Sequence, residues 1–193
     1  MKKTKRLIIR PLELKDYKQW VLYYTNMDKK KNLWDIEPKD PSQLTKSIFK
    51  EALKSQKKLR DLDQFYDYVV FEKRSGDMIG QVSAMDISRG LAQTCYLGYR
   101  IHNQYWGHGY GKEATLGLIS ICFENLKLHR VEAGIEPYNR RSILLARKIG
   151  LRKEGTKKRA VFLKNEWVDL VMYSATCEEF GHKWKGTSKP RLR

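Results

Sequence analysis

The fold of this chain is decided by the stretch Tyr96-Leu-Gly-Tyr-Arg-Ile-His-Asn-Gln-Tyr-Trp-Gly-His-Gly-Tyr-Gly-Lys-Glu-Ala114. A strand-like run ends in a loop with glycine at alternate positions, Gly107, Gly109 and Gly111, and the loop opens into a predicted helix over residues 112–127. Glycine lets backbone N–H groups turn inward, and the first N–H groups of a helix add unpaired donors at the positive end of its dipole. This arrangement suits a pyrophosphate, although a tight turn without a ligand would use the same residues.

Patterns on either side of this stretch predict a mixed sheet with helices on its faces. Strands are expected at residues 5–10, 66–73, 78–87, 94–101, 130–136, 160–163 and 167–174, and helices at 13–25, 40–58, 112–127 and 140–149. Residues 94–136 form a βαβ unit, which places its two strands parallel. Asp40 and Asn139 are expected helix caps, and Gly150 is an expected helix end. We therefore predict an α+β fold with a twisted, mostly antiparallel sheet and one central parallel strand pair.

Length and composition indicate one folded domain with a large positive charge. The chain has 193 residues, of which 41% are apolar, and a formal net charge of +17. No linker or repeat divides it, so we expect a single domain over residues 1–180 and a basic tail over residues 181–193. The positive field favours polyanionic partners such as RNA or a ribosomal surface, and it would repel polyamines.

Three cysteines, Cys95, Cys122 and Cys177, are far apart and offer neither a disulfide framework nor a metal-binding pair. Buried, reduced thiols are the simplest expectation, and no metal is expected. The chain has no run of about 18 apolar residues and no signal-peptide core at its start, so we expect no membrane association and a cytoplasmic location.

Four runs of residues match the motifs of one known family. They are Arg6-Leu-Ile-Ile-Arg-Pro-Leu12, Trp106-Gly-His-Gly-Tyr-Gly111, residues 128–142 and residues 148–155. The second run resembles the coenzyme A signature, Q/R-x-x-G-x-G/A, of the GCN5-related N-acetyltransferases, or GNAT enzymes. Together the runs are similar to the branch of that family that acetylates ribosomal-protein N-termini. The chain departs from the wider family at Ala146, where many relatives carry a tyrosine that protonates the leaving thiolate.

The resemblance implies a GNAT fold in which the two parallel strands splay apart, so that the pantetheine arm of acetyl-CoA enters between them. It implies cofactor contacts at Tyr99, Ile101, Trp106, Gly107, His108, Gly109, Tyr110, Gly111, Lys112, Asn139 and Arg140. Backbone N–H groups around Tyr99 and Ile101 would also face the acetyl oxygen, where negative charge develops during transfer. Asn139 can equally serve only as a helix cap.

Three residues are candidates for proton transfer. Ser142 is the candidate general acid, because its hydroxyl is nearest to the thiolate position that the resemblance implies, although Ser is structurally ordinary in a first helical turn. Glu132 and Glu136 are candidate bases on one face of the predicted 130–136 strand, although a salt-bridged surface carboxylate is the commoner fate of such a residue. Water held by backbone carbonyls is the alternative to both carboxylates.

These expectations combine into an N-acetyltransferase that moves an acetyl group directly from acetyl-CoA to a primary amine. The favoured acceptor is a protein N-terminal α-amine, as in the ribosomal-protein branch that the chain resembles. Two alternatives stay open: a small-molecule amine such as an antibiotic or a metabolite, and a basic RNA- or ribosome-binding module that keeps the fold without catalysis. The oligomeric state can be a dimer, although no motif in the sequence indicates one.

Overall fold

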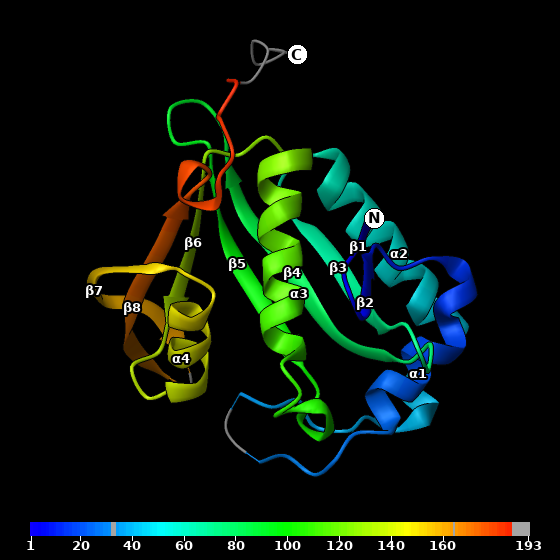
Figure 1. Cartoon of the computed structure of the whole chain (residues 1–193). Coiled ribbons are helices and arrows are strands. Elements are labelled where there is room, and N and C mark those ends of the chain that lie inside the picture. The colour runs from blue at the N-terminus through cyan, green and yellow to red at the C-terminus, as the bar shows by residue number, and fades with distance from the viewer. Residues whose placement is uncertain (32–33, 164, 187–193) are drawn as a thin grey trace. The chain divides into compact units, whose positions relative to one another are not determined.

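The computed structural model describes residues 1–31, 34–163 and 165–186. The strands are β1 (Lys2–Lys3), β2 (Leu7–Arg10), β3 (Tyr66–Glu72), β4 (Met78–Ser88), β5 (Thr94–Ile101), β6 (Arg130–Ile135), β7 (Arg152–Leu163) and β8 (Glu166–Thr176). The α-helices are α1 (Tyr17–Thr25), α2 (Lys46–Asp61), α3 (Tyr110–Ser120) and α4 (Arg140–Lys148), labelled in Figure 1.

The strands pair in the order β1-β2-β3-β4-β5-β6-β8-β7. β5 and β6 are parallel, whereas β1–β2, β2–β3, β3–β4, β6–β8 and β7–β8 are antiparallel. The predicted α+β fold, with a mostly antiparallel sheet and one parallel pair, is therefore confirmed.

The chain folds into two compact units. The first contains residues 1–85 and 98–118, and the second contains residues 86–97 and the chain from Ile119 onward. β4, β5 and α3 each contribute residues to both units.

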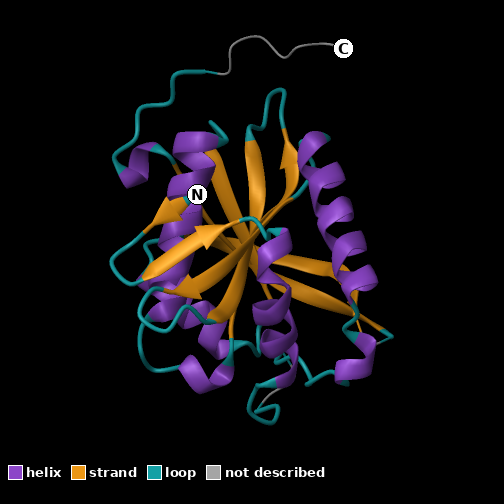
Figure 2. Cartoon of the chain, turned by 90° about the vertical axis from the view of Figure 1, so that its right-hand side faces the viewer, coloured by secondary structure: helices purple, strands orange, loops and turns teal. Residues whose placement is uncertain are grey.

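In the first unit, helices cover both faces of the strands (Figure 2). The side chains of one face pack with α1 and α2 in a cluster of Leu12, Trp20, Tyr23, Leu44, Phe49, Val69, Phe71 and Met78. On the opposite face, α3 passes so close to β2 that a Cβ atom on Gly117 would lie 2.4 Å from Cδ1 of Ile9. A larger residue at this position would have to displace the Ile9 side chain, so glycine allows the close approach of α3 to β2.

The helix predicted over residues 40–58 is wrong at its start, because two elements occupy that range. Asp40 caps a short 3-10 helix, Pro41–Gln43, by accepting a hydrogen bond from the Ser42 N–H at 2.8 Å. Thr45 then has an extended backbone and caps α2, which begins at Lys46 and runs to Asp61. The pattern of apolar residues does not reveal this interruption, since Leu44, just after the 3-10 helix, and Phe49 of α2 are buried in the same core.

In the second unit, the closing hairpin is longer than predicted. β7 and β8 span residues 152–163 and 166–176 instead of 160–163 and 167–174, and Lys164 of the predicted turn lies outside the described residues. The pairing shifts register twice, between Lys153 and Gly155 and between Lys157 and Val161. Each shift breaks the alternation of buried and exposed side chains, so the first half of β7 has no strand pattern in the sequence.

All three cysteines lie buried as free thiols in the second unit, as predicted. The sulfur atoms of Cys95 and Cys122 are 3.7 Å apart, a contact distance rather than a bond. Of the tail predicted over residues 181–193, residues 187–193 lie outside the described part. Within residues 181–186, the Trp184 indole N–H donates to the carbonyl of Lys127 at 3.3 Å and the ring packs on His129.

No helix in the described ranges is both long enough and apolar enough to cross a lipid bilayer.

Candidate active site

The glycine loop lies in the first unit, between β5 and α3. Gly107 and Gly109 have φ angles of +83° and +77°, a left-handed backbone that favours glycine. α3 begins at Tyr110, two residues earlier than predicted, and the N–H of Glu113 makes the first helical bond, 3.1 Å from the carbonyl of Gly109. The N–H groups of residues 110–112 therefore precede the helical ladder, and they are donors that a diphosphate can use.

The amino-terminal segment of the chain fastens the start of α3. The Glu113 carboxylate accepts hydrogen bonds from the Thr4 hydroxyl and the Arg6 N–H, each at 2.6 Å, and from Arg6 Nε at 2.7 Å. Burial opposes the charge of Glu113, but these bonds outweigh it and hold the pKa of the carboxyl below its usual value. We call this set of three residues, Thr4, Arg6 and Glu113, the clasp.

Arg6 also holds the loop itself. Its Nη1 donates to the carbonyl of His108 at 2.8 Å, and its guanidinium lies 4.4 Å from the centre of the Tyr110 ring. Because His108 uses its carbonyl in this way, the loop is fixed before any ligand arrives. This preorganisation fits a loop whose backbone N–H groups must all point at one anion.

The other side of the loop is attached to the end of β5. The Trp106 indole N–H donates to the carbonyl of Ile101, the last residue of β5, at 2.8 Å. Within α3, the Thr115 hydroxyl donates to the carbonyl of Gly111 at 2.8 Å. The Trp106 side chain thus connects the loop to the strand, while the expected cofactor contact of this residue stays a prediction. Tyr99 and Ile101 are half-buried on β5 in the same unit.

An open groove adjoins the loop in the first unit. Six of its lining residues are cations or tyrosines, namely Lys5, Arg6, Lys73, Arg74, Tyr105 and Tyr110. The other three are Glu72, Ser75 and Asp77. The Lys73 ammonium donates to the carbonyls of Thr4 and Lys5, which connects the β3–β4 turn to the clasp. Cations and aromatic rings in one groove are a chemistry that suits phosphates or nucleotides.

In the second unit, the parallel ladder covers only three residue pairs. It joins Thr94–Tyr96 of β5 to Arg130–Glu132 of β6, although β6 continues to Ile135. Within the described residues, the edge of β6 that faces β5 is therefore unpaired after Glu132. Such an edge offers backbone donors and acceptors to another extended group, and the splay that the resemblance implies stays a prediction.

The two candidate bases differ in their surroundings. Oε1 of Glu132 accepts from Arg130 Nε at 2.7 Å, so this carboxylate is an ion-pair partner. Burial, together with the charge of Glu132, raises the pKa of the Tyr96 hydroxyl opposite it in the ladder. Glu136 lies beyond the end of β6, which stops at Ile135, and its carbonyl accepts from the Asn139 N–H at 2.9 Å. The strand therefore ends one residue before its predicted limit, and the common face of Glu132 and Glu136 stays a prediction.

The start of α4 carries the remaining candidates in the second unit. Asn139 is the helix cap that the sequence predicted, since its Oδ1 accepts from the Ser142 N–H at 3.1 Å. Ser142 lies in the first turn, and Arg140 is exposed at the first position of the helix. Ala146 is fully buried, so the position that carries a tyrosine in many relatives provides no hydroxyl here.

The predicted site residues thus fall into two groups. The first unit brings together Tyr99, Ile101 and the loop from Trp106 to Lys112, and the second brings together Glu132, Glu136, Asn139, Arg140 and Ser142. Sequence reasoning did not find the clasp, because Glu113 and its partners are more than 100 positions apart in the chain. No local pattern records such a contact.

One group of possible metal ligands is also present, although the sequence predicted none. His129, Cys177 and Glu178 in the second unit place one ligand atom each within 4.8 Å of one another. Burial and the neighbouring Glu178 raise the pKa of the Cys177 thiol to about 11, which keeps it protonated and a poor ligand. His129 Nε2 lies 3.3 Å from Oε2 of Glu178, so a direct contact between these two side chains already engages two of the three groups.

Comparisons with known proteins show the family of the chain. Residues 6–152 match the family model described as "Acetyltransferase (GNAT) domain". The chain is 32% identical over 170 residues to "Probable N-acetyltransferase YjcK" of Bacillus subtilis, which covers 88% of this chain and 93% of that protein. It is 26% identical over 178 residues to the "[Ribosomal protein uS5]-alanine N-acetyltransferase" of Escherichia coli, covering 92% and 91%.

A solved structure shares the fold. The crystal structure of ribosomal-protein-S5-alanine acetyltransferase from Vibrio fischeri superposes with a TM-score of 0.74 at 22% identity, covering 96% of this chain and 98% of that one.

Proposed function

Because the chain belongs to the GNAT acetyltransferase family, we propose that it transfers an acetyl group from acetyl-CoA to the N-terminal α-amine of a protein, of the ribosomal-protein type. Acetyl-CoA is the cofactor of this family, and it supplies the activated thioester. The observation that carries the proposal is the glycine loop, whose unpaired N–H groups are fixed by the Arg6 bond to the carbonyl of His108.

The proposed cofactor contacts come from the predicted site residues of the first unit and of the second unit. Backbone N–H groups from Gly107 to Lys112 hold the diphosphate, because the N–H of Trp106 already donates to the carbonyl of Asn103 at 3.2 Å. Tyr99 and Ile101 offer backbone groups to the pantetheine arm and to the acetyl oxygen. In the second unit, Asn139 and Arg140 serve the same cofactor. Asn139 Oδ1 is occupied by the helix cap, so its amide nitrogen is the atom available for this contact.

The proposed proton transfers use Ser142, Glu132 and Glu136. We assign the acid to Ser142, because the buried Ala146 leaves no alternative hydroxyl on that face of α4. Of the two bases we favour Glu136, because the carboxylate of Glu132 is already engaged by Arg130 in an ion pair.

The acceptor class is supported by the relatives and by charge. The Escherichia coli relative is named for acetylating an alanine of ribosomal protein uS5. An N-terminal α-amine has a pKa of about 8, so little free energy is needed to deprotonate it near neutral pH. The net charge of +17 and the basic groove support association with ribosomal RNA, and the activity belongs in the cytoplasm, where ribosomes work. The exposed rings of Phe162 and Trp167 on the β7–β8 hairpin offer an apolar contact that supports a dimer as the proposed assembly. Light scattering would measure the assembly state.

The test is acetyl-CoA turnover with peptides that begin with Ala or Ser. Thiol release is expected with free N-termini and not with the same peptides acetylated beforehand. RNA binding without coenzyme binding would reject the enzyme and favour a basic binding module. Turnover with small amines but with no peptide would reject the proposed acceptor.

Two glycine variants test the loop directly. Gly107→Ala and Gly90→Ala place the same side chain at φ angles of +83° and +60°, where neither Cβ meets another atom within 4 Å. Both should lose about 1 kcal/mol of stability from backbone strain. Only Gly107→Ala should weaken coenzyme A binding in calorimetry, by about tenfold. Equal binding by both variants would remove the loop from the site.

The acid assignment has its own test. Ser142→Ala should lower kcat by at least about tenfold while leaving the KM for acetyl-CoA within about twofold. An unchanged kcat at saturating substrates would reject Ser142 as the acid.

A further inference from the structure

Arg6 reaches the glycine loop from the amino-terminal segment and keeps part of its guanidinium unused. Its Nε donates to Oε2 of Glu113 at 2.7 Å, and its Nη1 donates to the carbonyl of His108 at 2.8 Å. Among the residues that the structure describes, Nη2 has no hydrogen-bond acceptor. Since a guanidinium stays protonated in a protein, Nη2 keeps two N–H donors and a share of the positive charge.

The unused nitrogen lies beside the loop, where a ligand can reach it. A Cβ atom on Gly109 would be 3.6 Å from Nη2, and no other described atom outside the chain neighbours would come within 4 Å of it. A Cβ atom on Gly107 would meet no described atom within 4 Å. Both glycines are exposed, and the Arg6 side chain is 38% exposed. A ligand from solvent can therefore contact both Gly109 and Nη2.

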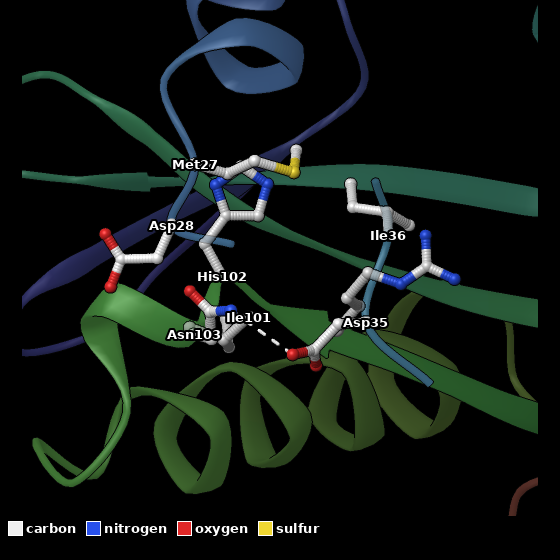
Figure 3. A pocket seen from close by; sticks show the side chains of 8 residues that line it. Met27, Asp28, Asp35, Ile36, Ile101, His102 and Asn103 are labelled. Atoms are coloured by element: carbon white, nitrogen blue, oxygen red, sulfur yellow. Dashed lines mark hydrogen bonds between the residues drawn. The ribbon is translucent and has the colours of Figure 1, made fainter. Parts of the chain in front are cut away.

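The other side chains that hold this region spend their donors on protein acceptors. The indole N–H of Trp106 donates to the end of β5. Just before the loop, Nδ2 of Asn103 donates to the carbonyl of Lys29 at 3.0 Å and to Oδ2 of Asp35 at 3.2 Å, and the second bond is the dashed line in Figure 3. Both amide hydrogens of Asn103 are therefore used. Of these three side chains, Arg6 is the one with donors left for a ligand.

The charges around Arg6 favour an anion. Glu113 offsets one positive charge, and its carboxylate also accepts from the Thr4 hydroxyl. The groove that Arg6 lines has four cations and two carboxylates, namely Lys5, Arg6, Lys73, Arg74, Glu72 and Asp77. This surplus of cations attracts a ligand that carries more than one negative charge.

We infer that Arg6 binds the diphosphate of acetyl-CoA directly, with Nη2 donating to a phosphate oxygen beside Gly109. Arginine suits this role, because its planar fork holds Glu113 and the His108 carbonyl with two nitrogens and offers the third to a phosphate. The amino-terminal segment is then part of the coenzyme site. The inference rests on the proposed function, because the diphosphate belongs to the cofactor of that reaction.

The first test uses the wild-type protein. Nitrogen-15 NMR records the guanidinium signals of its arginines, and the Arg6 signals are identified by their absence from Arg6→Lys. Coenzyme A and inorganic pyrophosphate should each shift the Arg6 signals in a saturable way and slow the exchange of the Nη2 protons with water. Pantetheine, which lacks phosphate, should leave these signals in place.

Each contrary result has a distinct meaning. Unshifted Arg6 signals while coenzyme A binds in calorimetry, or an equal shift with pantetheine, would overturn the Arg6 assignment and leave the proposed function standing. A shift with both phosphate compounds but without turnover of any amine would support the phosphate contact and reject the proposed function.

A variant pair gives the second test. Arg6→Gln removes the charge and the unused donors, while the backbone N–H of residue 6 stays available to Glu113. Its affinity for coenzyme A should be at least about tenfold below that of the wild type at about 0.1 M salt. The difference should shrink at about 1 M salt, because salt screens an ionic contact.

Thr4→Val is the matched control, because it removes the Thr4 hydroxyl from Glu113 and loosens the clasp while the guanidinium stays in place. Its affinity relative to the wild type should be the same at both salt concentrations. If the loss in Arg6→Gln is equally independent of salt, Arg6 only fastens the loop and the inference is overturned.

Discussion

Glu113 shows how one side chain can prepare a binding loop that it does not belong to. Its carboxylate gathers three hydrogen bonds from Thr4 and Arg6, and the same Arg6 reaches the carbonyl of His108 inside the loop. Three donors on one partly buried carboxylate make a charge-assisted set that is stronger than an exposed ion pair. The clasp therefore supports the loop for which we propose coenzyme binding, even though it contains none of the glycines.

The clasp predicts a particular dependence of stability on pH. The folded pKa of Glu113 lies below its unfolded value of about 4.3, so its contribution is complete above that value and is lost as pH falls through the folded pKa. Glu113→Gln should cost about 1–3 kcal/mol in urea unfolding at pH 7. The difference between the variant and the wild type should shrink as the pH is lowered from 7 to 3.

The control is Glu51→Gln, which changes the same charge on an exposed position of α2. It should leave the unfolding free energy within about 0.5 kcal/mol at both pH values. A parallel pH dependence for all three proteins would show that Glu113 is not the titrating group.

At the scale of elements, local signals decided which segments could be predicted. β5 was predicted with both of its ends, and α4 with its cap, because strand alternation and the Asn139 cap depend only on near neighbours. The two-residue strand β1, Lys2–Lys3, was missed because it has no apolar pattern and exists only through its pairing with Ile8 and Ile9. The register shifts in β7 were missed for the same reason, because the pairing with β8 determines them. The interruption at Thr45 is local, since Thr45 caps α2 through the N–H of Ile48, and it was missed because Asp40 is an equally good cap signal.

The Asn139 cap can be separated from any role in cofactor binding. Asn139→Ala should lower the unfolding free energy by about 1 kcal/mol, because the N–H of Ser142 loses its acceptor. Asn139→Ser restores a capping oxygen and should recover most of the stability, without recovering an amide nitrogen for the cofactor. Thermal unfolding with and without coenzyme A distinguishes the two contributions.

If Asn139→Ser regains both stability and coenzyme affinity, the residue is a cap only. If Asn139→Ser regains stability while its affinity for coenzyme A stays reduced, the side-chain amide of Asn139 contacts the cofactor.

At the scale of the molecule, the charge of +17 predicts salt-sensitive binding to RNA. Each neutralised phosphate contributes to the slope of log affinity against log salt, so affinity should fall at least about tenfold between 50 and 200 mM salt. Lys5→Gln combined with Arg74→Gln, in the basic groove, should weaken binding and flatten the slope. Filter binding with a ribosomal RNA fragment measures both quantities.

The control removes the same charge elsewhere. Lys50→Gln combined with Lys54→Gln on exposed positions of α2 should leave the affinity within about twofold, and an equal loss in both double variants would mean that net charge, and not the groove, binds RNA.

The candidate site was predictable to the extent that its residues are close in sequence. The loop from Trp106 to Lys112 and the Asn139 cap each lie within a few positions, so their composition and spacing indicate a geometry. The clasp and the hydrogen bonds of the Asn103 amide join residues that are 68 to 109 positions apart, such as Asn103 with Asp35 and Thr4 with Glu113. Only the folded chain brings those atoms together.

The burial of all three cysteines has a practical consequence for spectroscopy. Cys95, Cys122 and Cys177 are each at most 2% exposed, so maleimide dyes should react with them slowly in the native protein. A new cysteine at Leu91, a fully exposed side chain, would then take up a single fluorophore in an otherwise unmodified background. Fluorescence work on this enzyme can therefore begin from the natural sequence, with no need to remove its thiols first.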